Sequence, residues 1–350
     1  MDKSKLLLAF ASLFLSASFA HAHNALELTP TDTIKVANHK TNGILEPVKC
    51  DSRSNIYAQL FSGAGQPLDA PIVKISSDGT PTDFPLPRRE GKALEIRGFA
   101  PGVHEGVVML TMEPDPPYPF YVESYSDHGE LESRVTLPAE FHPMQIAAAT
   151  GGRFLISGFY SDTRATGVTP GRPGKPFAGI FAPDGALGRD VLLAEDDQTT
   201  EEKESANAAG AKQAHKRAPL VVSSTTVESS PDGNFILSRI ADGGPIYVIS
   251  AACFALESFE PPTIPGTQLN TVKAAEGHLV ALYIKKKAGS TQNEVSDVFI
   301  SLLDPQTGDE QLRYHGSPLE LGLSLACYDK GVFSFLSSGD DGGLQVVKAK

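Results

Sequence analysis

The sequence predicts an all-β fold made from one repeated unit. In six places a cluster of turn-forming residues leads into a short apolar strand, and four of the five intervals between these strands lie between 44 and 53 residues. The strands begin at Ile56, Val107, Phe154, Phe235, Leu279 and Val332. Such a period is typical of a four-stranded blade. Helical periodicity is nearly absent, and the strands lack strict alternation, which suits sheets that are buried on both faces. We therefore predict a six-bladed β-propeller, with seven blades, a β-sandwich pair and an open solenoid as alternatives.

A second hairpin follows most of these strands. Its turns contain glycine, as in Asp78-Gly79, Asp127-His128-Gly129, Pro183-Asp184-Gly185 and Pro305 to Gly308. Glycine is favoured there because tight hairpin turns need a positive φ. The fourth unit departs from the pattern, since residues 247–253 (YVISAAC) have no glycine at the turn.

The two ends of the repeat complement each other. The sixth unit stops near Lys350, one strand short of a blade, and an extended stretch from Leu26 to Val36 precedes the first unit. An N-terminal strand that completes the last blade would close the ring and leave no exposed sheet edge.

The first 22 residues have the pattern of a secretory signal peptide. Lys3 and Lys5 precede the apolar run from Leu6 to Leu15, and Ala20-His21-Ala22 supplies small residues for cleavage. Ten apolar residues are too few to cross a bilayer core of about 30 Å. We expect an exported protein, periplasmic or secreted, with no membrane anchor after cleavage.

The interval of 81 residues between Phe154 and Phe235 has an identifiable cause. Residues 194–219 contain few apolar side chains, with an acidic first half and a basic second half. Such a segment reads as a flexible insertion. Because the repeat continues on both sides, we predict a single domain over residues 23–350.

Composition excludes several classes of function. The net charge of −12 argues against nucleic-acid binding, which needs clustered lysine and arginine. The absence of Trp excludes WD40 blades with their Trp-Asp pair. No GxSxG, HExxH, P-loop or GxGxxG sequence occurs, so the usual signatures of hydrolases, zinc proteases and nucleotide-binding proteins are missing.

The strand-turn pattern, the Pro-Asp-Gly turns and the leader together resemble bacterial six-bladed propellers of the NHL and TolB-like type. The resemblance covers nearly the whole chain after residue 22, and it rests on turn chemistry. It implies a propeller fold, and it leaves the activity open because such propellers include binding scaffolds, lactonases and lyases.

Charge separates the two faces of the predicted ring. One side of the ring carries the connections between blades and the loops between second and third strands, and we call it the mouth face. The hairpin turns lie on the opposite side, which we call the hairpin face. The hairpin face receives Asp51, Asp78, Asp127, Asp184, Asp232, Glu276, Asp304 and Asp329. The mouth face receives Arg88, Arg89, His142, Arg164, Arg172, Lys175, Arg239 and Lys285-Lys286-Lys287. A relatively basic mouth on an acidic protein would attract anionic ligands. The alternative is a set of ordinary solvated loops, because acidic residues including Glu113 and Asp115 share this face.

The longest candidate loop, Ser161 to Pro176, lies on the mouth face and contains two arginines, a lysine and several prolines. Guanidinium and ammonium groups of this kind suit a phosphate or carboxylate clamp. Loops of this length are also common as decoration.

Metal sites are weakly indicated. A lactonase-type propeller, one of the activities that the resemblance allows, would hold Ca²⁺ in its channel through several oxygen ligands, and Glu46, Asn42 and Asn270 lie near the expected innermost strands. Cleavage after Ala22 would make His23 the first residue, and a copper site at its amine and ring would need another histidine such as His39.

Three cysteines in an oxidising compartment leave one unpaired. Cys50 and Cys327 occupy matching positions in units that become neighbours when the ring closes, so a disulfide at the seam is one possibility. The other is two buried thiols, since blades about 10 Å apart exceed the Cα separation that a disulfide spans. Cys253 is expected to be a small core residue.

These observations favour an exported, monomeric binding or interaction module. Its protein or anionic small-molecule partner would occupy the mouth surface formed by residues 88–90, 140–143, 161–176 and 285–293. The first alternative is a metal-dependent lactonase- or lyase-type propeller enzyme, and the second is a structural or assembly role. No cofactor is expected apart from the Ca²⁺ of the enzyme alternative.

Overall fold

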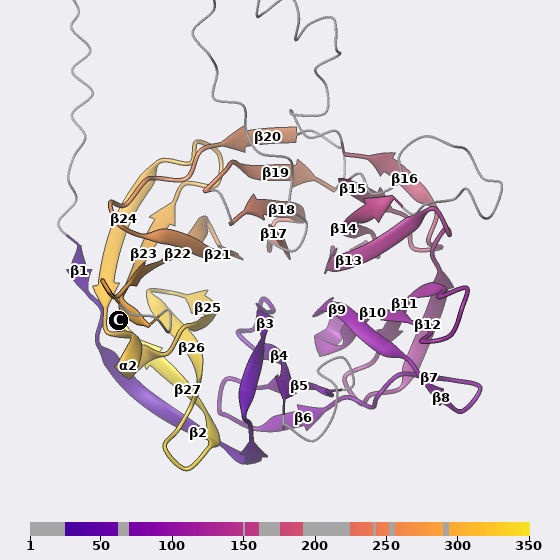
Figure 1. Ribbon diagram of the computed structural model, residues 1–350, viewed down its shortest axis with the longest axis horizontal. Helices are drawn as coiled ribbons and strands as arrows, with labels where there is room; N and C mark the ends of the chain where they lie inside the picture. The colour runs from indigo at the N-terminus through magenta and orange to yellow at the C-terminus, as the bar shows by residue number, and fades with distance from the viewer. Residues whose placement is uncertain are drawn as a thin grey trace, which may run out of the picture.

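The computed structural model describes residues 25–61, 70–149, 151–160, 176–191, 225–240, 243–251, 256–289 and 294–350. Their strands form six sheets arranged around a central axis, so the predicted six-bladed β-propeller is confirmed (Figure 1). The expected signal peptide, the insertion over residues 194–219 and Cys253 lie outside the described residues.

In each blade, strands that follow one another in the chain pair antiparallel and run from the axis outward, and blades 5 and 6 also receive strands from the N-terminal part of the chain. Blade 1 comprises β3 (Gly43–Cys50), β4 (Ile56–Phe61), β5 (Ile72–Ile75) and β6 (Pro81–Asp83). Blade 2 comprises β9 (Glu95–Pro101), β10 (Val107–Met112), β11 (Phe120–Tyr125) and β12 (Leu131–Thr136). Blade 3 comprises β13 (Phe141–Ala148), β14 (Phe154–Tyr160), β15 (Pro176–Phe181) and β16 (Leu187–Asp190).

The second half of the ring repeats this order. Blade 4 comprises β17 (Thr225–Ser229), β18 (Asn234–Arg239), β19 (Ile246–Ser250) and β20 (Leu256–Phe259). Blade 5 comprises β21 (Gln268–Ala275), β22 (His278–Lys286), β23 (Val295–Leu303) and β24 (Glu310–Gly316). Blade 6 comprises β25 (Ser324–Asp329), β26 (Val332–Ser338), β27 (Gly343–Ala349) and, from the other end of the chain, β2 (Pro30–Lys40).

The ring is closed by the N-terminal strand, as expected. β2 pairs antiparallel with β27, so it is the outermost strand of the last blade. The extended stretch is not one strand, however, because β1 (Leu26–Glu27) pairs parallel with β24 of blade 5. The two strands separate at Leu28, which is 2% exposed and packs between blades 5 and 6. Burying this side chain directs the chain from one blade to the next.

The core is divided among the interfaces between blades. The described residues contain six apolar clusters, and each joins one pair of neighbouring blades. In β10, for example, Leu110 faces blade 3 and the adjacent Met109 faces blade 1, and both are fully buried. This double burial explains why the strands read as continuous apolar runs.

The hairpin turns have the predicted backbone. Gly79 and Gly185 adopt φ values of +87° and +83°, and a Cβ at either position would collide with the neighbouring blade. The remaining elements are short: the hairpin β7 (Arg88–Arg89) and β8 (Lys92–Ala93), the 3-10 turn η2 (Val103–Glu105) and the helix α2 (Pro318–Leu321). Within the described part of the chain, no helix is long and apolar enough to cross a membrane.

Candidate functional site

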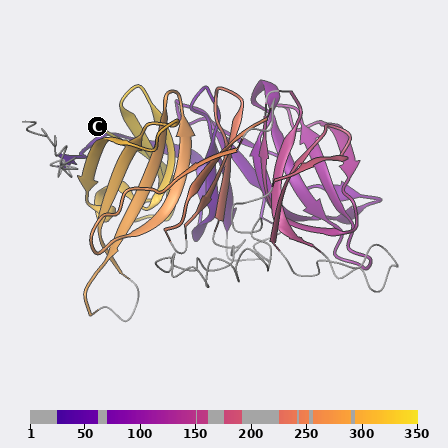
Figure 2. The ribbon, with the colours of Figure 1, turned by 90° about the horizontal axis from the view of Figure 1, so that it is seen from above.

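The mouth face carries the connections between blades and the loops between the second and third strands of each blade. β7 and β8 connect blades 1 and 2 on this face, and the β22–β23 hairpin, orange in Figure 2, extends beyond the other blades on the same side. Arg164, Arg172 and Lys175 lie outside the described residues.

The described basic residues of the mouth face are mostly paired. Arg89 donates to the Glu113 carboxylate and to the Tyr121 hydroxyl, and its guanidinium lies 5.2 Å from the Tyr121 ring centroid. The bond from the Tyr121 hydroxyl, with Arg89 beside it, lowers the pKa of Glu113. Lys92 pairs with Asp115 at 2.8 Å. Local pairing therefore reduces the positive field on the blade 2 side of this face.

The remaining predicted basic residues are dispersed. Arg88 donates to the Gly91 carbonyl and has an exposed side chain. His142 is half-buried against Phe120, and burial, together with Arg97, lowers its pKa. Arg239 is 3% exposed at the end of β18. In the β22–β23 hairpin, Lys285 lies 3.8 Å from Asp297 and Lys287 lies 3.0 Å from Glu294. The structure does not gather these residues into one cluster within its described part.

A different set of charges crosses the centre of the ring. The Nζ atoms of Lys49 on β3 and Lys273 on β21 lie 3.2 and 2.9 Å from the same carboxylate oxygen of Glu228 on β17. Lys49 also donates to the Val227 carbonyl, and Lys273 to the Val48 carbonyl. Blades 1 and 4 lie on opposite sides of the ring in Figure 1, so these contacts must cross the axis. We call Lys49, Glu228 and Lys273 the axial strut.

The axial strut is buried. Lys49 is 2% exposed, Lys273 3% and Glu228 7%. Burial lowers the pKa of Lys49, and the neighbouring Lys273 ammonium adds to this shift while Glu228 opposes it. All three residues lie near the ends of their strands that lead into the hairpin face. The strut therefore spans the axis near that face.

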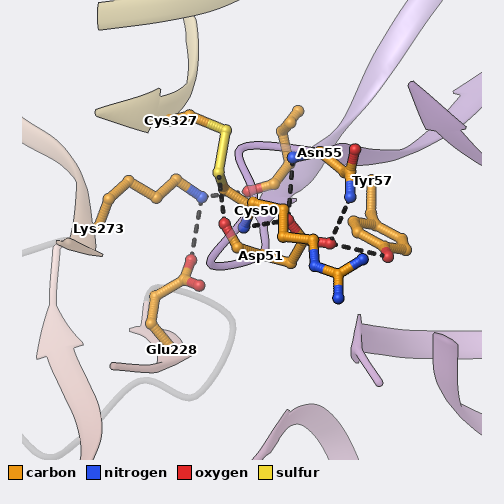
Figure 3. The surroundings of a disulfide bond; sticks show 9 residues. Cys50, Asp51, Asn55, Tyr57, Glu228, Lys273 and Cys327 are labelled. Carbon is orange, nitrogen blue, oxygen red and sulfur yellow. Dashed lines mark hydrogen bonds and ion pairs between the residues drawn. A yellow bond between two sulfur atoms is a disulfide. The ribbon is translucent and has the colours of Figure 1, made fainter. Parts of the chain in front are cut away.

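A disulfide lies beside the strut. Cys50 at the end of β3 and Cys327 on β25 are joined, with their Cα atoms 5.5 Å apart (Figure 3). Inner strands converge toward the axis, so blades 1 and 6 approach more closely there than the mean spacing of blades suggests. The Asp51 carboxylate shapes the adjacent turn by accepting bonds of 2.9 Å from the amides of Arg53 and Asn55.

Of the residues considered for Ca²⁺, Asn42 and Asn270 lie toward the other end of the inner strands, whereas Glu46 lies in the middle of β3. Asn42 precedes β3, Glu46 is exposed and accepts a bond from the Val48 amide, and Asn270 lies at a register shift of β21. The axial strut consists of two ammonium groups and one carboxylate that they already share, and the Glu46 carboxylate acts electrostatically on Lys49. Hard cations need several free oxygen ligands, so the axial strut does not fit a calcium ion. Among the described residues, no group of three or more His, Cys, Asp or Glu side chains suits a metal.

The copper alternative involves one described residue. The His39 ring nitrogens lie 2.9 Å from an Asp83 carboxylate oxygen and 2.8 Å from the Ala37 carbonyl oxygen, both of which are acceptors, so both ring nitrogens already have partners. His23 lies outside the described residues.

Sequence reasoning missed the axial strut, although a signal was present. Lys49 and Lys273 each follow a valine near the end of an innermost strand, in the sequences Val48-Lys49 and Val272-Lys273. A lysine repeated at such a position, where both faces of a strand are buried, indicates a buried partner.

The six blades and the closing strand define this chain as a six-bladed β-propeller, in agreement with its resemblance to the NHL and TolB-like type. No protein-family model and no curated protein matches the sequence. Among solved structures, a gluconolactonase from Xanthomonas campestris is 12% identical with a TM-score of 0.46, covering 93% of this chain and 98% of its own.

Two further structures have a comparable likeness. Streptogramin B lyase is 10% identical with a TM-score of 0.43, covering 92% of this chain and 97% of its own. A Bacteroides caccae protein of unknown function is 12% identical with a TM-score of 0.44, covering 80% and 85%. Likeness at this level concerns the fold alone.

Proposed function

We propose that this chain is an exported binding module that holds an anionic ligand, or an anionic segment of a partner protein, on its mouth face. The axial strut carries the proposal. Two lysines and a glutamate from three blades meet at the axis near the hairpin face, and the single carboxylate of this group is already shared by the two ammonium groups instead of being free for a metal. Recognition is then left to the faces of the ring.

The sign of the charges favours the mouth face for an anion. The described turns of the hairpin face carry Asp51, Asp78, Asp127, Asp184, Asp232, Glu276, Asp304 and Asp329. An anion is repelled from such a surface, whereas exposed Arg88 and Lys286 lie on the opposite side. Export rests on the leader-like residues 1–22 and is part of the proposal.

Charge reversal on the two faces tests this proposal. We expect a Lys286→Glu variant to elute from a dextran sulfate column at a lower salt concentration than the unaltered protein, because an attractive charge becomes repulsive at the binding face. Lys330→Glu is the matched control, since it makes the same change in net charge on the hairpin face, where Lys330 is exposed. Equal shifts in both variants would contradict a mouth-specific site.

The metal content of the purified protein tests the enzyme alternative. We expect no tightly bound Ca²⁺ after purification without chelator. About one Ca²⁺ per chain that raises the melting temperature, and that a Glu46→Gln variant loses, would overturn the proposal in favour of a metal-dependent propeller enzyme.

A further inference from the structure

A cleft of about 840 Å³ opens between blades 4 and 5 on the hairpin face, opposite the mouth. Ile236, Val248 and Leu279 contribute an apolar floor, and polar residues of the turns surround it. Its volume lies within the range of small-molecule sites. The cleft is independent of the proposed mouth site, because it lies on the other face.

Blades 3, 4 and 5 differ at one position beside this gap, just before or at the start of the second strand. In blades 3 and 5 the side chain at this position contacts the next blade at the hairpin end. In blade 3 this residue is Arg153, whose guanidinium donates to the Ala251 carbonyl of blade 4. In blade 5 it is His278, whose ring lies 5.8 Å from the Tyr328 ring of blade 6.

The corresponding residue of blade 4 does not reach blade 5. It is Asn234, at the start of β18, and among the described residues its side-chain amide bonds only Asp232 of its own turn, at 3.0 Å. Within the described part of the chain, Asn234 therefore does not make across this gap the contact that Arg153 makes between blades 3 and 4.

Blade 5 also has a residue equivalent to Ala251, which in blade 4 accepts the hydrogen bond from Arg153. Phe235 pairs with Ile249 in blade 4, and the equivalent Leu279 pairs with Leu303 in blade 5. Ala251 and Pro305 each lie two residues after these partners, so Pro305 is the counterpart of Ala251. The Ala251 carbonyl is the group that accepts the hydrogen bond from Arg153. Pro305 lines the cleft.

The charge of the cleft suits a cation. Its described lining includes the carboxylates of Asp232, Glu257 and Glu276, one histidine, His278, and no lysine or arginine. Glu257 and Glu276 are exposed and have no hydrogen-bond or ion-pair partner within the described part of the chain. The cleft therefore combines an apolar floor with two unpaired carboxylates at its rim.

We propose that the cleft between blades 4 and 5 binds a guanidinium group on an aliphatic stem, such as an arginine side chain. The guanidinium would take the place that Arg153 holds one blade earlier, with Glu257 and Glu276 as its carboxylate partners, and the stem would lie on Ile236 and Val248. Planar guanidinium groups pair well with carboxylates and carbonyl oxygens.

Ligand-observed NMR with N-acetyl-arginine amide tests the proposal. We expect weak, saturable binding with a Kd of about 1 mM, because the carboxylates are exposed to water. N-acetyl-glutamine amide, a neutral compound with a shorter stem, should show no saturable binding. Equal binding of the two compounds would overturn the proposal.

Variants locate the site. Glu257→Gln combined with Glu276→Gln should raise the Kd about fivefold or more, whereas Glu130→Gln combined with Glu132→Gln, on the outer part of blade 2, should leave it unchanged. Asn234→Arg should abolish binding and raise the melting temperature, because it supplies the guanidinium from the chain itself. Unchanged affinity in the Glu257/Glu276 variant would show that the cleft is not the site, even if Asn234→Arg fails to fold.

Discussion

Lys49, Glu228 and Lys273 bring two ammonium groups onto one carboxylate at a place where water has little access. Removing ions from water is costly, and here hydrogen bonds to the Val227 and Val48 carbonyls compensate part of that cost. The net attraction among the three groups therefore adds little to the free energy of unfolding, whereas removal of one of them would leave an uncompensated charge in the interior. Without the carboxylate, two buried ammonium groups would face each other.

We therefore expect Glu228→Gln to lower the free energy of unfolding by about 3–5 kcal/mol at pH 7. The pKa of Lys49 is already lowered by burial, and losing Glu228 should lower it further. The unfolded chain then binds more protons than the folded one below the ordinary lysine pKa, so the stability of the variant should rise as pH rises. Urea unfolding at pH 7 and pH 9.5 measures both effects, with Glu276→Gln as an exposed control. A loss below about 1 kcal/mol would contradict the role given to the strut.

Arg153 provides a second test at the same scale. Its guanidinium bridges blades 3 and 4 through the Ala251 carbonyl. Arg153→Asn should reproduce the open gap of blade 4 and reduce the free energy of unfolding by about 1–2 kcal/mol, as expected for one charge-assisted hydrogen bond. Urea unfolding measures the loss. Addition of N-acetyl-arginine amide should restore part of it, and an unaltered midpoint in Arg153→Asn would show that the bridge contributes nothing.

Among the strands, β2 and β3 determine how the ring closes. β2 supplies the outer strand of blade 6, and the disulfide at the end of β3 joins blades 1 and 6 at the axis across 277 residues of sequence. The seam is thus held at its outer edge by backbone hydrogen bonds and at its inner edge by a covalent bond. Either connection restricts the same opening of the ring.

We expect reduction of the disulfide to lower the free energy of unfolding by about 2–4 kcal/mol without unfolding the protein, because β2 still closes blade 6. Urea unfolding in a Cys253→Ser background, with and without reductant, measures this loss. The variant Cys50→Ala/Cys327→Ala should behave like the reduced protein. Loss of the native circular dichroism spectrum on reduction alone would show that β2 is insufficient to close the ring.

Across the whole molecule, buried phenols and hydrogen-bonded carboxylates limit the pH range of stability. Burial raises the pKa of Tyr57, Tyr125 and Tyr283. The bond from the Ser76 hydroxyl, with further bonds at Thr80, lowers the pKa of Asp78 to about 2. Glu105, paired with Lys74 and Arg53, has a lowered pKa as well.

The signs of these shifts predict a stability plateau. Raised tyrosine pKa values stabilise the fold below the unfolded value of about 10, and this contribution is lost as pH rises further. Lowered carboxylate pKa values stabilise it above about pH 4, and this contribution is lost as pH falls toward 2. Urea midpoints from pH 2 to 11 should show both limbs, and Tyr57→Phe should make the alkaline limb less steep. An alkaline limb equally steep in Tyr57→Phe would assign the loss to other groups.

Features that recur along the chain were predictable from the sequence. The six blades, the glycine turns and the N-terminal closing strand follow from short segments whose turn residues and apolar runs act locally. The division of the first stretch into β1 and β2 was not predictable, because it depends on Leu28 packing between two blades. The pairing of the mouth residues escaped prediction for a similar reason: Arg89, in the connection between blades 1 and 2, contacts Glu113, which follows a strand of blade 2 and lies 24 residues away in sequence.

Two features depend on how the blades meet. Lys49 and Val227 are 178 residues apart in sequence, and Lys273 and Val48 are 225 apart, so no local pattern reports that they touch. The cleft between blades 4 and 5 likewise lies where the side chains of two blades meet, and there Asn234 bonds its own turn whereas Arg153 reaches across to the next blade. Local chemistry along the chain was enough to specify a ring of six blades, whereas the axial charges and the unfilled cleft arise from contacts that form only when that ring closes.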